Sequence, residues 1–197
     1  MQEQEIDIEA LKKDENFIKD LKKLEDEMKN QGSIDKGYQL LGTKLAIEAS
    51  EDEINEIFTF IVERAFDILA DYLTQNRGFS ITNPEELATA RAIYEHGIQR
   101  YSENDIKGAK EIFLVLNHTV EDNEIKDAMM IHACAVMAGH SFDKFIEEFA
   151  DINNIDENDP TAFFIKEFQQ PTDMLLAMFK NYVKLGEREL EVLRESR

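Results

Sequence analysis

Four histidines and one cysteine are the residues of this chain best suited to metal binding or nucleophilic chemistry. Di-iron helical bundles place a glutamate three residues before a histidine on one helix face. No glutamate stands at that spacing before any of the four histidines, and the zinc motif HExxH is also absent. His132 and His140 share a helix face only if one helix runs through Gly139, which glycine disfavours. We therefore predict that the protein binds no metal.

Catalysis by a thiol or a carboxylate also lacks support in the sequence. Cys134 lies in the alanine-rich segment HACAVMA, whereas a reactive thiol needs an exposed setting with nearby cations. Adjacent acids such as Glu147 and Glu148 are unremarkable among 42 acidic residues, and general acid–base catalysis requires a desolvated, paired carboxylate. The glycines form neither a P-loop nor a dinucleotide-binding motif. We expect no catalytic residue and no cofactor, and hence a protein that is not an enzyme.

The formal net charge of −20 limits the classes of partner. Nucleic acid is an unsuitable partner because binding phosphates requires clustered lysines and arginines, and an acidic surface is repelled by anionic lipid. No stretch approaches the roughly 20 apolar residues that span a bilayer. The polar first residues lack a signal-peptide pattern, and a single cysteine excludes an intramolecular disulfide. These features predict a cytoplasmic protein, without membrane insertion, whose partner is another protein.

The elements that carry these residues are expected to be helices throughout. Eight glycines and three prolines are few for 197 residues, and no run of β-branched residues alternates between turn signals. Two capping patterns are typical of helix starts: Ser50 with Glu53, and Asn83-Pro84 with Glu86 as the capping-box partner of Asn83. Apolar periodicity predicts helices at residues 8–30, 37–49, 50–77, 84–101, 106–116, 123–138 and 142–152. A short helix is expected after Asp159-Pro160 and a long C-terminal helix at 173–197. The residues around 76–83 are expected to be a linker.

Residues 1–36 are expected to form an amphipathic helical arm beside a helical domain at 37–197. Apolar residues recur there at three- and four-residue steps among lysines and acids: Leu11, Phe17, Ile18, Leu21, Leu24 and Met28. Such a helix is more often a solvated arm or a dimer-forming element than part of a core. A homodimer through this N-terminal helix is therefore one alternative function.

The segment ARAIYEHGIQRYSENDIKGAKEIFLVLN, residues 90–117, resembles a tetratricopeptide repeat. Gly97 and Ala109 stand at the small-residue positions that let two helices approach closely, and Tyr101 and Phe113 stand at the aromatic positions beside them. The usual tryptophan, turn glycine and closing proline are replaced by Ile93, Asn104 and Glu121. A second unit, HACAVMAGHSFDKFIEEF, has the same order of a small-residue helix, a glycine turn and an aromatic helix.

Residues 90–149 as a whole are similar to the tetratricopeptide core of the SycD/LcrH-like translocator chaperones of type III secretion. The resemblance rests on Tyr101–Phe113 and Ala133–Phe149. It implies stacked antiparallel TPR-like hairpins at about 84–152, in a cofactor-free adaptor or secretion chaperone that holds a client segment in a concave groove. The partner-binding residues that it implies lie on the first helices of the hairpins: Tyr94, Gly97, Tyr101, His132 and Val136.

Two further questions remain open from the sequence. A helical enzyme or small-ligand sensor would require a closed, polar-lined pocket between helices, in which His132 converges with Glu or Tyr side chains. Six phenylalanines are either core or an exposed client-binding strip, and their helical spacing favours core: Phe142, Phe145, Phe149, Phe163, Phe164 and Phe168.

Overall fold

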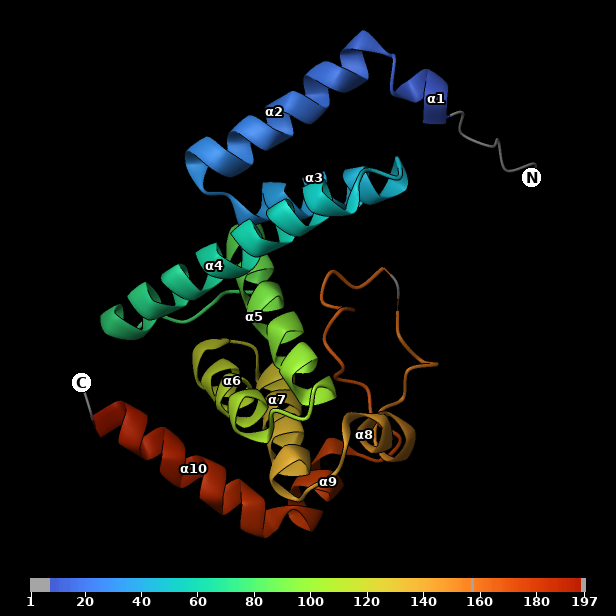
Figure 1. The fold of residues 1–197 in the computed structure, drawn as a ribbon. Coiled ribbons are helices and arrows are strands. Elements are labelled where there is room, and N and C mark those ends of the chain that lie inside the picture. The colour runs from blue at the N-terminus through green and yellow to red at the C-terminus, as the bar shows by residue number, and fades with distance from the viewer. Residues whose placement is uncertain (1–7, 157, 196–197) are drawn as a thin grey trace. The chain divides into compact units, whose positions relative to one another are not determined.

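The protein is helical throughout the part of the chain that its computed structural model describes, residues 8–156 and 158–195 (Figure 1). The extended pairing within those residues consists of two isolated bridges, Phe79–Val120 and Ala150–Phe168. The predicted all-α class is confirmed. The helices are α1 (Ile8–Leu11), α2 (Glu15–Gln31), α3 (Ile34–Ala46), α4 (Glu51–Gln75), α5 (Pro84–Ser102), α6 (Ile106–Thr119), α7 (Asn123–Met137), α8 (Phe142–Glu148), α9 (Thr172–Met178) and α10 (Lys180–Glu195).

The chain divides into two compact units, one ending at Asp67 and the other beginning at Ile68, so the boundary lies inside α4. The sequence placed a boundary after residue 36 instead. The structure differs because α2 packs on α3 and buries Met28. Gly37 of α3 also approaches α4 closely, since a Cβ at this position would stand 2.9 Å from Ile61 Cγ1. Met28 at the end of α2 is therefore part of the core of the first unit, whereas Ile18 of the same helix stays 49% exposed.

Local capping determines where the helices of the first unit begin and end. The Asp14 carboxylate accepts hydrogen bonds from the N–H groups of Asn16 and Phe17, which starts α2 and breaks the single helix predicted at 8–30. Gly32 ends α2 with a φ of +67°, in the left-handed conformation that glycine adopts readily. The capping box predicted at the start of α4 is present, because Ser50 and Glu53 exchange backbone-to-side-chain hydrogen bonds.

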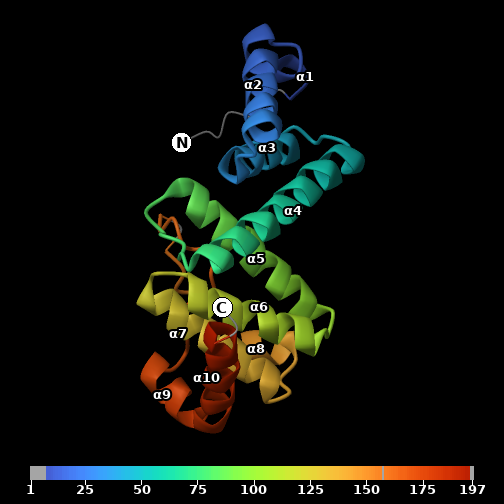
Figure 2. The ribbon, with the colours of Figure 1, turned by 90° about the vertical axis from the view of Figure 1, so that its left-hand side faces the viewer.

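Helices α5, α6 and α7 of the second unit form successive hairpins, in which α6 packs against both neighbours (Figure 2). Gly97 of α5 lies directly against α6, where a Cβ would stand 2.8 Å from Ile112 Cγ2. Ala109 is fully buried in the same hairpin. The turn between α5 and α6 contains Asn104 with a φ of +63°, a conformation in which asparagine is enriched. The predicted stacked hairpins are present, and the small residues have the predicted spacing role.

The linker predicted around residues 76–83 is fastened to the body of the second unit. Phe79 N–H donates a hydrogen bond of 2.7 Å to Thr119 O at the end of α6. The Phe79 ring is fully buried and stacks on Tyr72, with ring centroids 4.8 Å apart. A polar segment with one buried aromatic residue is therefore a structural strap here, because the ring anchors it.

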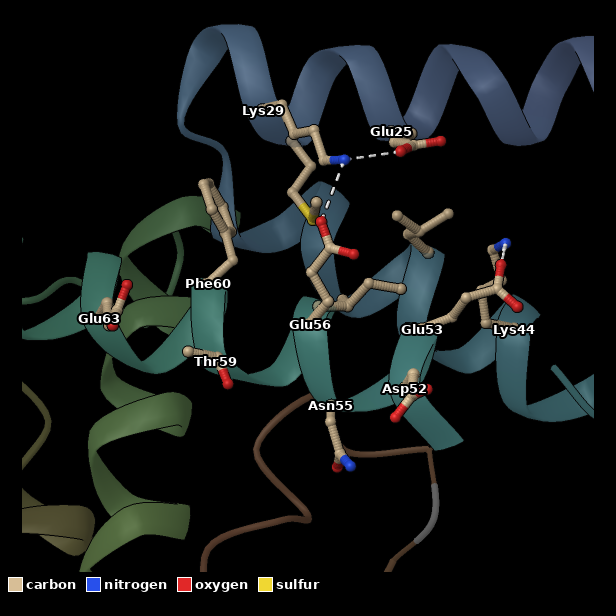
Figure 3. A pocket seen from close by; sticks show the side chains of 13 residues that line it. Glu25, Lys29, Lys44, Asp52, Glu53, Asn55, Glu56, Thr59, Phe60 and Glu63 are labelled. Carbon is tan, nitrogen blue, oxygen red and sulfur yellow. Dashed lines mark hydrogen bonds and ion pairs between the residues drawn. The ribbon is translucent and has the colours of Figure 1, made fainter. Parts of the chain in front are cut away.

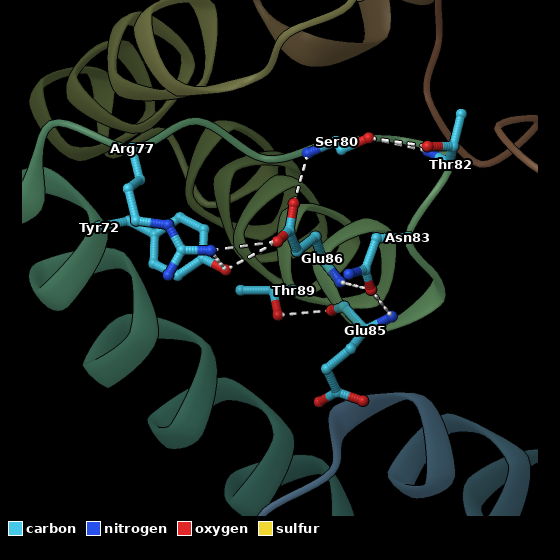
Figure 4. Close-up of polar contacts among 8 residues, drawn as sticks. All are labelled: Tyr72, Arg77, Ser80, Thr82, Asn83, Glu85, Glu86 and Thr89. Carbon is cyan, nitrogen blue, oxygen red and sulfur yellow. Dashed lines mark hydrogen bonds and ion pairs between the residues drawn. The ribbon is translucent and has the colours of Figure 1, made fainter.

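Glu86 holds the other end of this strap (Figure 4). The sequence predicted Glu86 as the capping-box partner of Asn83. Asn83 does cap α5 by accepting from the N–H groups of Glu85 and Glu86. The Glu86 carboxylate instead accepts from Tyr72 Oη–H at 2.9 Å and from Ser80 N–H at 2.7 Å. This carboxylate thus ties α4, the strap and α5 together.

Residues 158–164 form turns instead of the short helix predicted after Asp159-Pro160. The Asp159 carboxylate accepts hydrogen bonds from the N–H and the hydroxyl of Thr161, a local geometry that competes with helix formation. Phe164 is buried in the second unit and lies against Tyr94, with ring centroids 5.0 Å apart. This phenylalanine is core, as its spacing favoured.

The C-terminal part of the second unit contains shorter helices than predicted. α8 ends at Glu148, before the end predicted at residue 152, because Ala150 pairs with Phe168. The long helix predicted at 173–197 is two helices, α9 and α10, with a turn at Phe179; residues 196–197 lie outside the described chain. The Phe179 ring is buried 5.5 Å from the ring of Phe149, so core packing holds the break in place.

Candidate functional site

The five residues predicted to bind a partner all lie in the interior of the second unit: Tyr94, Gly97, Tyr101, His132 and Val136. The four that carry side chains are at most 2% exposed. The resemblance implied an open concave face, but other aromatic rings cover these residues: Phe164 lies on Tyr94, and Phe142 lies on Tyr101. We assign the five to the core, because a partner would reach them only if this unit opened.

A hydrogen-bonded chain explains how a polar His132 is accommodated in this core. His132 Nδ1 lies 2.8 Å from Ala128 O, which can only accept, so Nδ1 carries the proton. Tyr94 Oη–H then donates to His132 Nε2 at 3.2 Å, and Tyr94 Oη accepts from Ile165 N–H at 3.0 Å. Burial lowers the pKa of His132 to about 4 and raises the pKa of Tyr94. The ring is neutral at pH 7 and has every polar atom paired.

Cys134 is a buried thiol, and the described residues contain no cluster of potential metal ligands. Burial raises the pKa of the Cys134 thiol to about 12, which keeps it protonated and unreactive at neutral pH. In residues 8–156 and 158–195, no group of three or more His, Cys, Asp or Glu side chains is placed to hold a metal ion.

A groove of about 560 Å³ lies in the first unit, among α2, α3 and α4 (Figure 3). It is lined by Glu25, Met28, Lys29, Leu40, Lys44, Asp52, Glu53, Asn55, Glu56, Ile57, Thr59, Phe60 and Glu63. Figure 3 shows Lys29 directed from α2 toward Glu56 of α4, whereas Asp52, Asn55 and Thr59 lie on the opposite side of α4 in this view. These three residues therefore border the groove from the far side of α4, away from Lys29.

The floor of the groove is apolar. Met28, Leu40 and Ile57 are buried, and Phe60 is half-buried one turn of α4 beyond Glu56. Each of the three helices contributes at least one of these side chains, so the floor depends on how α2, α3 and α4 pack together. Met28, Leu40 and Ile57 are at most 5% exposed, so the apolar surface of the floor that can reach a partner is chiefly that of Phe60. Covering it favours binding of an apolar group, because burial removes it from water.

The rim of the groove is charged and predominantly acidic. Lys29 Nζ lies 2.8 Å from Glu25 Oε1 and 3.5 Å from Glu56 Oε1, and these contacts, that with Glu25 foremost, raise the pKa of Lys29. Glu53 accepts hydrogen bonds from Lys44 and from Ser50, which together lower the pKa of its carboxyl to about 2. The Glu53 carboxylate is therefore ionised at neutral pH.

The sequence analysis did not predict this groove, because no local pattern shows that its lining residues lie close together. Ile57 and Phe60 are three residues apart on one helix face, and Met28 ends the apolar series of α2. Contacts among α2, α3 and α4 bring these residues together. All three helices lie outside residues 90–149, which carry the resemblance. Helix periodicity could have indicated an apolar face on α4, but not which part of it stays uncovered.

Comparison with known proteins finds no match: no protein-family model, no curated protein and no solved structure matches the chain. The functional conclusion therefore depends on the geometry of this chain alone. Within the described residues, every helix is too short or too polar to cross a lipid bilayer.

Proposed function

We propose that this protein is a non-catalytic adaptor that holds a segment of another protein in the groove of its first unit. The observation that carries the proposal is the combination of an apolar floor with a charged rim. Protein-binding surfaces share this arrangement, in which an apolar centre supplies affinity and a polar border is hydrated. The proposal keeps the protein-binding role expected from the sequence but moves the site from residues 90–149 to α2, α3 and α4.

The lining favours a protein segment over a small molecule. Small-molecule sites place a few polar groups where they converge on the ligand. Here the two lysines of the lining are engaged by carboxylates, Lys29 by Glu25 and Glu56, and Lys44 by Glu53. Phe60 is half-buried and offers apolar contact, above the buried side chains of Met28, Leu40 and Ile57. Such a floor suits apolar side chains of another chain.

The chaperone role in type III secretion remains a proposal supported by the resemblance of residues 90–149. The buried core of the second unit, with Tyr94 and His132 in its centre, does not present a client groove in this conformation. A chaperone of this kind would have to use a different surface. The groove of the first unit is the surface that we propose for it.

Site-specific photo-crosslinking in the source cells tests the proposed function. A photoreactive phenylalanine analogue replaces Phe60, which is half-buried at the groove, and a matched chain carries it at Lys22, exposed on α2 outside the groove. We expect one dominant protein adduct from position 60 that position 22 does not give. Equal adducts at both positions, or none, would contradict the proposal, and an adduct between two copies of the chain would support the homodimer instead.

A further inference from the structure

We propose that the segment held by this groove is an amphipathic helix with lysines or arginines along the edges of its apolar face. This inference rests on the proposed function and specifies its partner. Three observations support it: the charge of the rim, the position of Lys29, and the length of the lining along α4.

The rim has an excess of negative charge. Four carboxylates, from Glu25, Glu53, Glu56 and Glu63, line the groove against two ammonium groups, and Asp52 adds a fifth on the far side of α4. Both lysines are already engaged by rim carboxylates. The whole chain carries a net charge of −20, so the long-range field also attracts a basic segment and repels an acidic one.

Lys29 shows where a cation from a partner would bind. Its ammonium lies between Glu25 of α2 and Glu56 of α4, above the apolar floor (Figure 3). The Lys29 side chain is 47% exposed and Glu56 is 71% exposed. Ion pairs this exposed contribute little to stability, so a lysine or arginine of a partner can replace Lys29 at low cost.

The lining is long enough for a helix to lie along it. From Glu53 to Glu63 it follows α4 for about 15 Å at 1.5 Å per residue. Helices that bind in grooves insert apolar side chains spaced three and four residues apart, with charged residues at the borders. The apolar floor and acidic rim match the two parts of such a helix.

A displayed library of amphipathic helices of about 18 residues, five helical turns, tests the inference. Its apolar face is fixed as leucines, and its border positions are randomised among Lys, Arg, Glu, Gln and Ser. The wild-type protein selects from it in parallel with Phe60→Ser, whose folding is checked by thermal melting. We expect enrichment of Lys and Arg at the borders with wild type and loss of that enrichment with Phe60→Ser.

The affinity of one enriched peptide then locates the rim charges by fluorescence anisotropy. Glu25→Gln with Glu56→Gln should weaken binding roughly tenfold, from loss of two exposed ion pairs. The matched pair Asp20→Asn with Asp26→Asn removes the same charge from exposed α2 positions outside the groove and should change affinity less than about twofold. Lys29→Gln should tighten binding, because it frees both carboxylates.

The outcomes separate this inference from the proposed function. Enrichment that depends on Phe60 but shows no preference for Lys or Arg would overturn the basic helix while the groove remains a protein-binding site. Equal weakening by the rim pair and the α2 control pair would also overturn it, because only the net charge would then matter. No enrichment above Phe60→Ser would overturn both.

Discussion

Each unit contains a helix with an apolar face, but one face is fully covered by another segment and the other is covered only in part. In the second unit, the face of α5 that carries Tyr94 is covered by Phe164 from a distant segment, and its polar atoms are paired internally. In the first unit, the face of α4 that carries Ile57 and Phe60 is covered only in part, and a groove remains. An apolar face thus becomes core or stays partly open, as at the proposed binding groove, according to whether another part of the chain covers it.

The ionisable groups of the two regions also differ in charge state. His132 is fully buried and stays neutral, because burial lowers its pKa to about 4. Glu53 at the groove stays charged, because Lys44 and Ser50 lower its pKa to about 2. Low dielectric surroundings disfavour the charged form, whereas a neighbouring cation at the surface favours it. The core therefore excludes charge, and the groove retains it.

Truncating one phenylalanine in each unit should separate the buried core from the groove most strongly. Phe113→Ala should lower the free energy of unfolding by about 3–5 kcal/mol, because the ring is fully buried and leaves a cavity. Phe60→Ala should lower it by about 1 kcal/mol or less, because the ring is half-buried at the groove. Urea denaturation measures both values. Similar losses would show that Phe60 is core and that the groove is not a surface.

Removing one hydroxyl tests the internal pairing of the second unit. Tyr94→Phe should cost about 1–3 kcal/mol, because His132 Nε2 loses its donor and Ile165 N–H loses its acceptor in a buried site. Tyr101→Phe is the matched control, since its hydroxyl donates to the backbone, chiefly to His140 O. Tyr101→Phe should lower the free energy of unfolding less than Tyr94→Phe in the same urea titration. The reverse order would contradict the hydrogen-bonded chain through Tyr94 and His132.

The buried His132 should make stability depend on pH. Its pKa is about 4 in the folded protein and 6.5 as a model value, so the unfolded chain takes up the proton first as pH falls. Wild type should therefore lose about 2 kcal/mol between pH 7 and pH 5 relative to His132→Gln. Parallel urea titrations at both pH values measure the difference. An equal change in the two proteins would show that His132 does not titrate as a buried group.

Three helix starts were predicted to the residue because caps are local, whereas α3 starts at Ile34, capped by Ser33, and not at the predicted residue 37. Pro84 begins α5, Asn123 begins α7 and Phe142 begins α8, each at the residue where the sequence placed it. The N-cap residues Asn83, Asp122 and Ser141 accept backbone hydrogen bonds within three residues, so a short window contains the whole signal.

The covering of the candidate binding residues was not predictable in the same way. Tyr94 was expected on an open face, but Ile165 and Phe164 reach it from some seventy residues further along the chain. That return depends on the turn at Asp159 and the pairing of Ala150 with Phe168, which have no helical period. The groove was missed for the corresponding reason, because it forms where three helices leave a face uncovered.

The ion pair between Lys44 and Glu53 at the groove should change stability least. Lys44 is the largest cause of the lowered pKa of Glu53, ahead of Ser50. The carboxyl of Glu53 should titrate near pH 2 in wild type and at a higher pH in Lys44→Gln, as NMR of its side-chain carboxyl would measure.

The same shift makes stability depend on pH. Because the folded pKa of Glu53 lies below the model value of 4.5, the stabilisation is present above pH 4.5 and is lost as pH falls toward 2. The loss should be smaller than that from His132, because Glu53 is exposed and solvent screens the pair. An unchanged midpoint in Lys44→Gln would mean that Lys44 does not hold this charge, and that Ser50 and the helix N-terminus do.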